Sequence, residues 1–213
     1  MKLTHQQMRL YAVTDRAWAA DEDAFFAQIE AAIDGGAGVV QLREKHASRE
    51  EFLHLAERFV ALCRRRGVVS IINDNVDIAA AVGADGVHVG QEDLEAGRAR
   101  ALLGTDKIIG VSTHSVAEAQ AAQAAGADYL GVGAAFVTGT KTDAKPVGHD
   151  VIRAVTAAVD IPVVAIGGIG RDNILELSGC GLAGVAVVSA LFAQKDVAAA
   201  ARELHDLAEQ IAR

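Results

Sequence analysis

Two cationic residues, Arg43 and Lys45, follow the end of an apolar segment of the chain and are separated by one residue. Val39-Val40 leads directly into Gln41-Leu42-Arg43-Glu44-Lys45. In an extended strand alternate side chains share a face, so Arg43 and Lys45 would project together. A guanidinium fork and an ammonium group both suit phosphate oxygens. The segment therefore predicts a diphosphate site, and a solvated ion-pair cluster around Glu44 is the alternative.

Carboxylates follow the next two predicted strands. Asp74 stands in Asn73-Asp74-Asn75, and Asp93 ends Gln91-Glu92-Asp93. One or two carboxylates, completed by water and substrate phosphates, are the usual protein ligands of Mg²⁺. For either Asp taken alone, the N-cap of a following helix is the preferred interpretation. Facing an Arg/Lys cluster, the pair favours a metal that offsets the repulsion between carboxylates and a diphosphate.

Hydroxyl and imidazole groups follow the fifth predicted strand, in Ser112-Thr113-His114-Ser115. Ser112 is nearest the strand end and is the candidate for substrate contact. Ser115, with Glu118 three residues later, predicts a helix cap. The role of His114 is left undecided. His88, inside the fourth predicted strand, is interpreted as a packed core histidine.

The longest predicted loop covers residues 134–148. It contains Thr138, Gly139, Thr140 and Lys141, which could donate hydrogen bonds to phosphate. Long loops in compact domains often close over a site, so we expect a flap. A merely mobile surface loop is the competing interpretation.

A second anion site is predicted at the ends of the last two strands. Gly167 and Gly168 follow the seventh strand, and Val188 and Ser189 follow the eighth. Glycine lets an anion approach the backbone, and a helix N-terminus offers free N–H groups. The alternative is that the glycines only serve a tight turn. Two anion sites together suit a reaction that joins a diphosphate ester to a phosphorylated acceptor.

These groups need a scaffold that brings eight strand ends to one face. Short β-rich segments alternate with helical ones, such as the apolar stripe Phe52, Leu55, Phe59 and Leu62. Their number and their continuous Val/Ile composition predict a single-domain (β/α)₈, or TIM, barrel over residues 1–213. An open doubly wound sheet is less suitable, because Thr14-Asp15-Arg16, not a glycine-rich loop, follows the first strand. The predicted strands are 10–14, 39–42, 69–72, 86–89, 108–111, 129–132, 162–166 and 184–188.

Composition limits the function classes. The 213 residues are 51% hydrophobic with 2 Pro, which suits one domain with a sizeable core. A net charge of −8 argues against a nucleic-acid partner. The apolar segment 182–193 is too short to span a membrane, and the polar segment 1–9 does not resemble a signal peptide, so we expect a cytoplasmic protein with no membrane partner. Cys63 and Cys180 are interpreted as reduced residues packed in helices. Whether the chain forms a homo-oligomer is left undecided.

Over residues 10–191 the chain resembles the thiamine-phosphate synthase (thiamine-phosphate pyrophosphorylase) family. That family is a TIM barrel that joins 4-amino-2-methyl-5-hydroxymethylpyrimidine diphosphate to 4-methyl-5-(2-phosphoethyl)thiazole, or its carboxylated form. Thiamine phosphate forms and pyrophosphate leaves. The motifs that carry the resemblance are Gln41-Leu42-Arg43-Glu44-Lys45, Ile72-Asn73-Asp74, His88-Val89-Gly90-Gln91-Glu92-Asp93, Gly110-Val111-Ser112-Thr113-His114, Thr138-Gly139-Thr140-Lys141 and Ile166-Gly167-Gly168-Ile169.

The resemblance implies a role for each matching position. Gln41, Leu42, Arg43, Glu44, Lys45 and Asn73 would hold the pyrimidine diphosphate, with Asp74 and Asp93 on Mg²⁺. Ser112 would lie by the reacting centre, Lys141 would bind the diphosphate, and Thr138, Gly139, Thr140, Gly168, Val188 and Ser189 would hold the thiazole phosphate. The implied chemistry is dissociative. Of the implied catalytic residues Arg43, Lys45, Ser112 and Lys141, the three cations would stabilise leaving-group charge together with the metal, which explains why no obvious nucleophile or base is present.

Two other functions share this scaffold. A thiazole tautomerase relative would isomerise the thiazole precursor, and a non-catalytic barrel would only bind phosphate. The presence of Asp74, Asp93, Arg43, Lys45 and Lys141 together favours the synthase, because a tautomerase has no diphosphate to hold.

Overall fold

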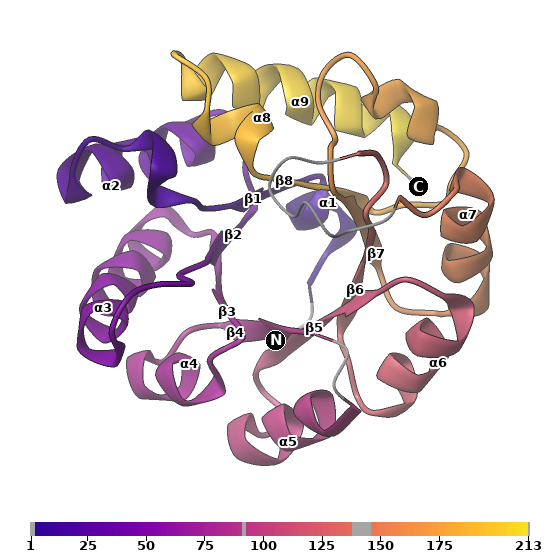
Figure 1. Ribbon diagram of the computed structural model, residues 1–213, viewed down its shortest axis with the longest axis horizontal. Helices are drawn as coiled ribbons and strands as arrows, with labels where there is room; N and C mark the ends of the chain where they lie inside the picture. Colours follow the sequence, from indigo (N-terminus) through magenta and orange to yellow (C-terminus); the bar gives the residue numbers. More distant parts are fainter. Residues whose placement is uncertain (1–2, 91–92, 138–145, 213) are drawn as a thin grey trace.

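Eight parallel strands close into a barrel in the computed structural model (Figure 1), which describes residues 3–90, 93–137 and 146–212. Each strand pairs with the next, and β8 pairs back with β1. The predicted (β/α)₈ barrel is confirmed and the open sheet is excluded. The strands are β1 (Leu10–Val13), β2 (Val39–Leu42), β3 (Val69–Asn73), β4 (Gly86–Val89), β5 (Ile108–Thr113), β6 (Tyr129–Gly133), β7 (Val163–Ile166) and β8 (Gly184–Val187).

Helices form a ring outside the strands (Figure 1). The connection from β7 to β8 differs from the predicted pattern, because it carries only the short 3₁₀ helix η2. Gly170, Gly179 and Gly181 interrupt this segment, and glycine disfavours a long helix. The helices are α1 (His5–Met8), η1 (Arg16–Trp18), α2 (Glu22–Asp34), α3 (Arg49–Arg66), α4 (Val76–Val82), α5 (Asp93–Leu103), α6 (Val116–Ala124), α7 (His149–Ala158), η2 (Ile174–Leu177), α8 (Ser189–Phe192) and α9 (Val197–Ile211).

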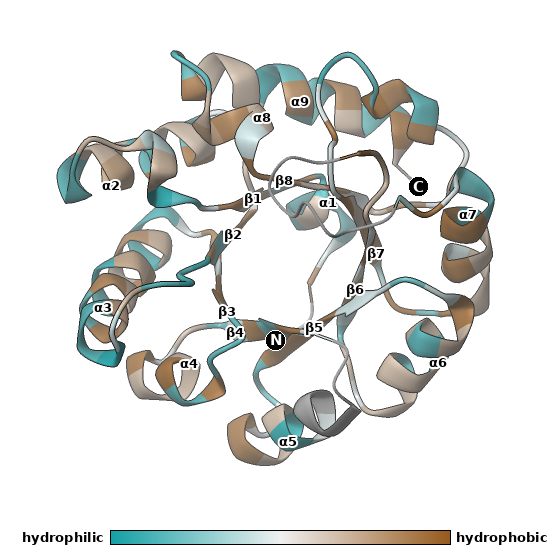
Figure 2. Cartoon of the chain, in the orientation of Figure 1, coloured by the Kyte–Doolittle hydropathy of each residue, from teal (hydrophilic) through white to brown (hydrophobic). Residues whose placement is uncertain are grey.

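Alternation along each strand divides its side chains between two environments. In β2, Val40 and Leu42 pack outward against the helices, whereas Val39 packs inside the barrel and Gln41 faces the same way. Both faces of the strands are therefore buried, as expected of a parallel sheet, and Figure 2 shows them as mainly apolar. The predicted stripe on α3 is buried against the sheet.

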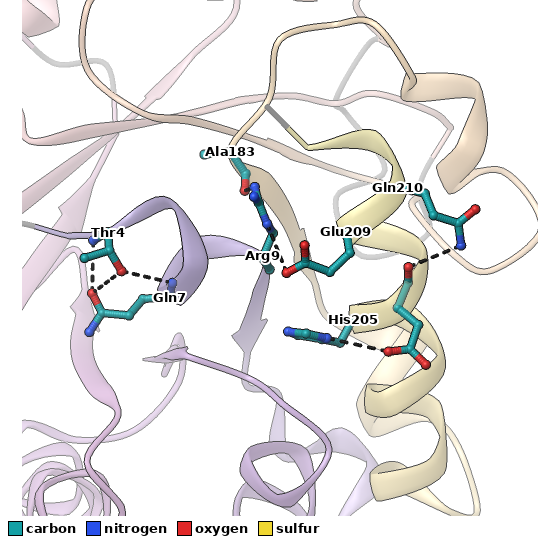
Figure 3. Close-up of polar contacts among 8 residues, drawn as sticks. Thr4, Gln7, Arg9, Ala183, His205, Glu209 and Gln210 are labelled. Carbon is teal, nitrogen blue, oxygen red and sulfur yellow. Dashed lines mark hydrogen bonds and ion pairs between the residues drawn. The ribbon is translucent and has the colours of Figure 1, made fainter.

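The N-terminal end of the barrel is closed by α1. Met8 is fully buried there, in one cluster with interior residues such as Ile71 and Ile108. Figure 3 shows how this segment is held: Arg9 donates to the carbonyl oxygen of Ala183 at 2.9 Å and to Glu209 of α9 at 3.2 Å. The apolar plug leaves the opposite end of the barrel for polar chemistry.

Two sequence-based expectations about the remaining residues have clear outcomes. Both cysteines are buried and free of disulfides, and Cys63 lies in α3 as predicted. Cys180 does not lie in a helix but in the bend after η2, because the glycines on either side of it end the helical segment. Among the described helices, none combines the length and apolar character needed to cross a membrane.

The barrel interior depends on a glycine for one of its largest side chains. A Cβ atom at Gly110 of β5 would lie 2.1 Å from Cζ of Tyr129. We predict that Gly110→Ala lowers the free energy of unfolding by about 1–3 kcal/mol, as overpacked cores do. Gly97→Ala is the matched control, because a Cβ there meets nothing and alanine favours the interior of α5. Urea unfolding followed by circular dichroism measures both; equal midpoints for the two variants would contradict this packing.

Candidate active site

One pocket opens at the carboxyl ends of the strands, where function concentrates in this fold. Its walls come from the ends of β1 to β8, so the barrel closure itself assembles the site. The inward-facing positions of the alternation supply most of the polar groups. The predicted site residues that line it are Gln41, Arg43, Asn73, Ser112, Gly168, Val188 and Ser189.

Other predicted site residues lie elsewhere. Leu42 points outward and is fully buried among the helices, so its side chain does not reach the pocket. Lys45 is exposed beyond the end of β2 and is not part of the described pocket wall. The strand ends at Leu42, so the alternation that placed Arg43 and Lys45 on one face no longer applies to Lys45.

Part of the predicted site falls outside the described residues. Thr138, Gly139, Thr140 and Lys141, and with them most of the predicted flap, belong to this group. Asp93 begins α5, but its side chain lies outside the described part of the chain. The predicted roles of these residues stay predictions.

Arg43 is held in the pocket wall by the loop that follows β1. Its backbone N–H donates to Oγ1 of Thr14 at 3.1 Å, and its Nη1 lies 3.6 Å from the Asp15 carboxylate. The Arg43 side chain is only 13% exposed. A partly buried cation needs a compensating charge, and Asp15 supplies one. The sequence contained Thr14 and Asp15 directly after a strand, but which strand end they would contact was not visible from it.

Glu44 has a structural partner that explains its place in the motif. Arg16 donates to the Glu44 carboxylate at 3.1 Å and contacts Glu51 of α3 at 2.9 Å. The Glu44 side chain is 6% exposed. Burial raises its pKa, and the neighbouring Arg16 opposes that rise. The side chain therefore joins the loops after β1 and β2 and is not part of the described pocket wall.

Asp74 occupies an unusual backbone conformation at the rim. Its φ of 60° lies in the left-handed region, which non-glycine residues rarely adopt except Asn and Asp. Its N–H donates to the carbonyl oxygen of His88 at 2.8 Å, and Asn73 donates to its carboxylate at 2.7 Å. The N-cap of α4 is Asn75, so the capping role considered for Asp74 is wrong. The carboxylate is exposed beside the pocket and can accept a hard cation.

A hydrogen-bonded chain of five side chains crosses the interior below the pocket. Gln41 donates to the Tyr11 hydroxyl at 2.8 Å, and the hydroxyls of Tyr11 and Tyr129 are 2.7 Å apart. The Tyr129 hydroxyl lies 2.9 Å from Nδ1 of His88, whose Nε2 lies 2.9 Å from Oγ of Ser112. His88 is buried, as predicted for a core histidine, and it also lines the pocket.

Sequence reasoning missed both tyrosines. Their inward positions in β1 and β6 follow from period-two alternation, and glycines within the strands provided a further signal of large side chains in the interior. Gly110 leaves room for the Tyr129 ring, and Gly131 approaches His88 with a 3.3 Å distance from a built Cβ to Cε1. Glycine inside a strand often marks such a close approach.

The last two strand ends complete the wall. Gly168 has φ +66°, and a Cβ there would lie 2.4 Å from the carbonyl oxygen of Val137. Phe136 N–H donates to Gly167 O at 3.0 Å, so the loops after β6 and β7 pack backbone to backbone. The glycines therefore allow close packing of the two loops. This role is compatible with the predicted anion contact, because Gly168 also lines the pocket. Ser189 begins α8, whose first N–H groups have no partner within the helix.

His114 and Ser115 divide the two roles considered for this segment. Ser115 caps α6 by accepting from Glu118 N–H at 3.3 Å, which confirms the predicted cap. The Glu118 carboxylate accepts from the N–H of His114 at 2.6 Å and lies 3.2 Å from its Nδ1. His114 lines the pocket while remaining tied to α6.

Comparison with known proteins gives consistent results. A family model described as thiamine monophosphate synthase matches residues 10–191. Thiamine-phosphate synthase of Alkaliphilus oremlandii is 51% identical over 205 residues, covering 96% of this chain and 98% of the relative. That of Chloroflexus aurantiacus is 52% identical over 200 residues, covering 93% and 92%. The solved thiamine phosphate pyrophosphorylase from Pyrococcus furiosus has a TM-score of 0.88 at 37% identity, covering 97% of this chain and 98% of that one.

The Arg16–Glu44 pair generates a pH-dependent prediction. Arg16→Ala leaves a buried carboxylate without its cation; because Arg16 is 36% exposed, we expect a loss of about 1–2 kcal/mol rather than the larger cost of a fully buried pair. Burial raises the pKa of Glu44 above its ordinary 4.5, so the folded chain binds this proton more tightly than the unfolded chain. Stability therefore falls as pH rises through that window, more steeply in the variant, and the loss shrinks on acidification.

Urea unfolding of both chains across acidic and neutral pH measures this difference. Arg171→Ala is the control, because its contacts with Asp172 and Glu203 are surface pairs at 3.8 Å. A loss in Arg16→Ala that stays constant with pH would show that Glu44 is not the group involved.

Proposed function

We propose a reaction from one premise: this chain belongs to the thiamine monophosphate synthase family and is a thiamine-phosphate synthase, a transferase of thiamine biosynthesis. Its small-molecule substrates would be 4-amino-2-methyl-5-hydroxymethylpyrimidine diphosphate and 4-methyl-5-(2-phosphoethyl)thiazole or its carboxylated form. The pyrimidinylmethyl group would pass to the thiazole nitrogen, and pyrophosphate would leave.

The observation that carries this proposal is that both predicted anion positions open into one pocket. Arg43 and Asn73 line it from β2 and β3, and Gly168 and Ser189 line it from the ends of β7 and β8. A site for a single phosphate would need only one of these groups. Two phosphorylated substrates bound in one enclosure would have their reacting ends brought together.

The described groups suit stabilisation of a leaving diphosphate. Thr14 holds the Arg43 backbone and Asp15 pairs with its guanidinium, so this cation has a preferred position before substrate arrives. Preorganised donors and charges of this kind stabilise charge that develops during bond breaking. We propose that Arg43 and Ser112 act in this way from the described pocket wall, together with Lys45 and Lys141 from the adjoining loops. The bond to the diphosphate would break first, and the thiazole nitrogen would capture the resulting cation.

We further propose Mg²⁺ as the cofactor. The exposed Asp74 carboxylate beside Asn73 offers the hard oxygen ligands that this ion prefers, and Asp93 is the second proposed ligand. Within the described residues, no three His, Cys, Asp or Glu side chains gather as a protein-only metal cage would require. When bound, the ion would neutralise charge on the leaving diphosphate.

Several finer expectations stay predictions. They are a cytoplasmic location and the lack of a nucleic-acid partner; the oligomeric state and the preference between the free and carboxylated thiazole phosphates are left open.

The reaction is tested by measuring pyrophosphate. We expect release only when both substrates and Mg²⁺ are present, complete loss with EDTA, and recovery when Mg²⁺ is restored. Asp74→Asn should raise the Mg²⁺ concentration needed for half-maximal release, because one anionic ligand is lost. No release from the two substrates under any metal condition would overturn the proposed reaction.

Arg43 gives a sharper test of leaving-group stabilisation. Arg43→Gln should lower kcat by about 10²-fold or more, the usual cost of removing one preorganised charge-stabilising donor. Arg49→Gln makes the same change at an exposed position at the start of α3, away from the pocket wall, and should leave kcat unchanged. Steady-state kinetics at saturating Mg²⁺ compares the two; similar kcat values in both variants would remove Arg43 from this role.

A further inference from the structure

The buried hydrogen-bonded chain joins two parts of the pocket wall that the proposed reaction uses separately. It begins at Gln41 on β2 and ends at Ser112 on β5, with Tyr11, Tyr129 and His88 between them. We propose that Tyr129 and His88 are positioning residues, and that the Gln41 amide sets the direction of the chain so that the Ser112 hydroxyl is presented as a hydrogen-bond donor. What Ser112 donates to rests on the proposed function; the direction of the chain does not.

The direction begins at Gln41. An amide nitrogen can only donate, so the Tyr11 oxygen accepts the 2.8 Å bond from Gln41 Nε2. Within the described residues, the only other hydrogen-bond partner of the Tyr11 hydroxyl is Tyr129, at 2.7 Å. If Tyr129 donated instead, the Tyr11 hydrogen would be buried without an acceptor, which is costly. Tyr11 therefore donates to Tyr129.

Matching each hydrogen to one acceptor also fixes the next bond, between Tyr129 and the His88 imidazole. Burial raises the pKa of both phenols far above neutrality, so each carries one hydrogen. Tyr129 accepts from Tyr11 and must send its own hydrogen to Nδ1 of His88, 2.9 Å away. A neutral imidazole that accepts at Nδ1 carries its hydrogen at Nε2. His88 is thereby held as the Nε2–H tautomer.

The last bond decides what the pocket receives. Nε2–H of His88 donates to Oγ of Ser112 at 2.9 Å, which occupies the hydroxyl as an acceptor. Ser112 then does not donate to His88, so its hydroxyl can serve as a donor on the pocket side, and in the proposed reaction the developing anion is a matching acceptor. A hydroxyl that accepts a hydrogen bond is also polarised into a better donor. The reverse chain direction would present Ser112 to the pocket as an acceptor, which an anion would repel.

The interior is built around this chain. Tyr11 and Tyr129 are 1% and 0% exposed and meet inside the barrel with ring centroids 5.8 Å apart. Glycines make room for it: a Cβ at Gly110 would overlap the Tyr129 ring, and a Cβ at Gly131 would lie in tight contact with His88, at 3.3 Å. A barrel that needed only stability could fill this space with apolar side chains.

The tautomer of His88 tests the direction without substrate. We expect nitrogen NMR of the ¹⁵N-histidine-labelled full chain, at mildly alkaline pH, to show His88 as the Nε2–H tautomer, with its signal assigned through His88→Gln. An Nδ1–H tautomer or an imidazolium would overturn the proposal. The wild-type spectrum decides this even if a substituted chain fails to fold.

Kinetics tests whether Tyr129 acts through Ser112. Tyr129→Phe should produce a mixture of His88 tautomers and lower kcat by about 10- to 100-fold, the rate equivalent of one hydrogen bond to a charged group, with little change in KM. Ser112→Ala should lower kcat similarly, and the double variant should lose little more than either single one. Fully additive losses would indicate two independent structural effects and would overturn the coupling.

A matched control separates this role from general damage to the interior. Ser70→Ala removes a buried hydroxyl that donates to Asp85 at 2.8 Å, outside the wall of the active-site pocket. It should change neither the His88 tautomer nor kcat, and a change in both would contradict the positioning role. If no chain released pyrophosphate, the proposed reaction would fail while the NMR result on chain direction would stand.

Discussion

Every polar side chain that faces into a closed barrel must find a partner there, because water is excluded and an unpaired buried group is costly. Strand alternation turns Gln41, Tyr11, Tyr129 and His88 into this interior, and each of them is bonded to the next. The lower half of the barrel avoids the problem with apolar residues under the α1 plug. The polar chain therefore marks the level at which the interior changes from a packed core to the floor of a site.

Charge at the mouth of the pocket follows the same requirement. Arg43 is paired with Asp15, and Glu44 is paired with Arg16. Two ion pairs of opposite polarity therefore join the loops after β1 and β2. This arrangement keeps a cation in the pocket wall without leaving it unpaired, and it joins the local stability of the two loops to the orientation of the diphosphate-binding group proposed here.

The site also contains conformations that a purely stable barrel would not need. Asp74 adopts a positive φ at the rim, and glycines at 110 and 168 give up side chains so that a phenol ring and a neighbouring backbone can approach. Strain and lost packing of this kind are concentrated at functional sites and are compensated by the surrounding fold. Here the compensation comes from strands that are buried on both faces and from the ring of helices around them.

The sequence by itself determined the fold class and part of the pocket wall, because strand periodicity, helix stripes and residue order along a (β/α)₈ barrel are local properties. All eight strands and the inward placement of Arg43, Asn73 and Ser112 follow from them. Only the tertiary structure decided the partners. Tyr11 and Tyr129 are 118 positions apart and meet because the barrel closes, and Glu44 turns to Arg16 because the chain leaves the strand after Leu42. Contacts between distant positions depend on closure and register, which local pattern does not contain.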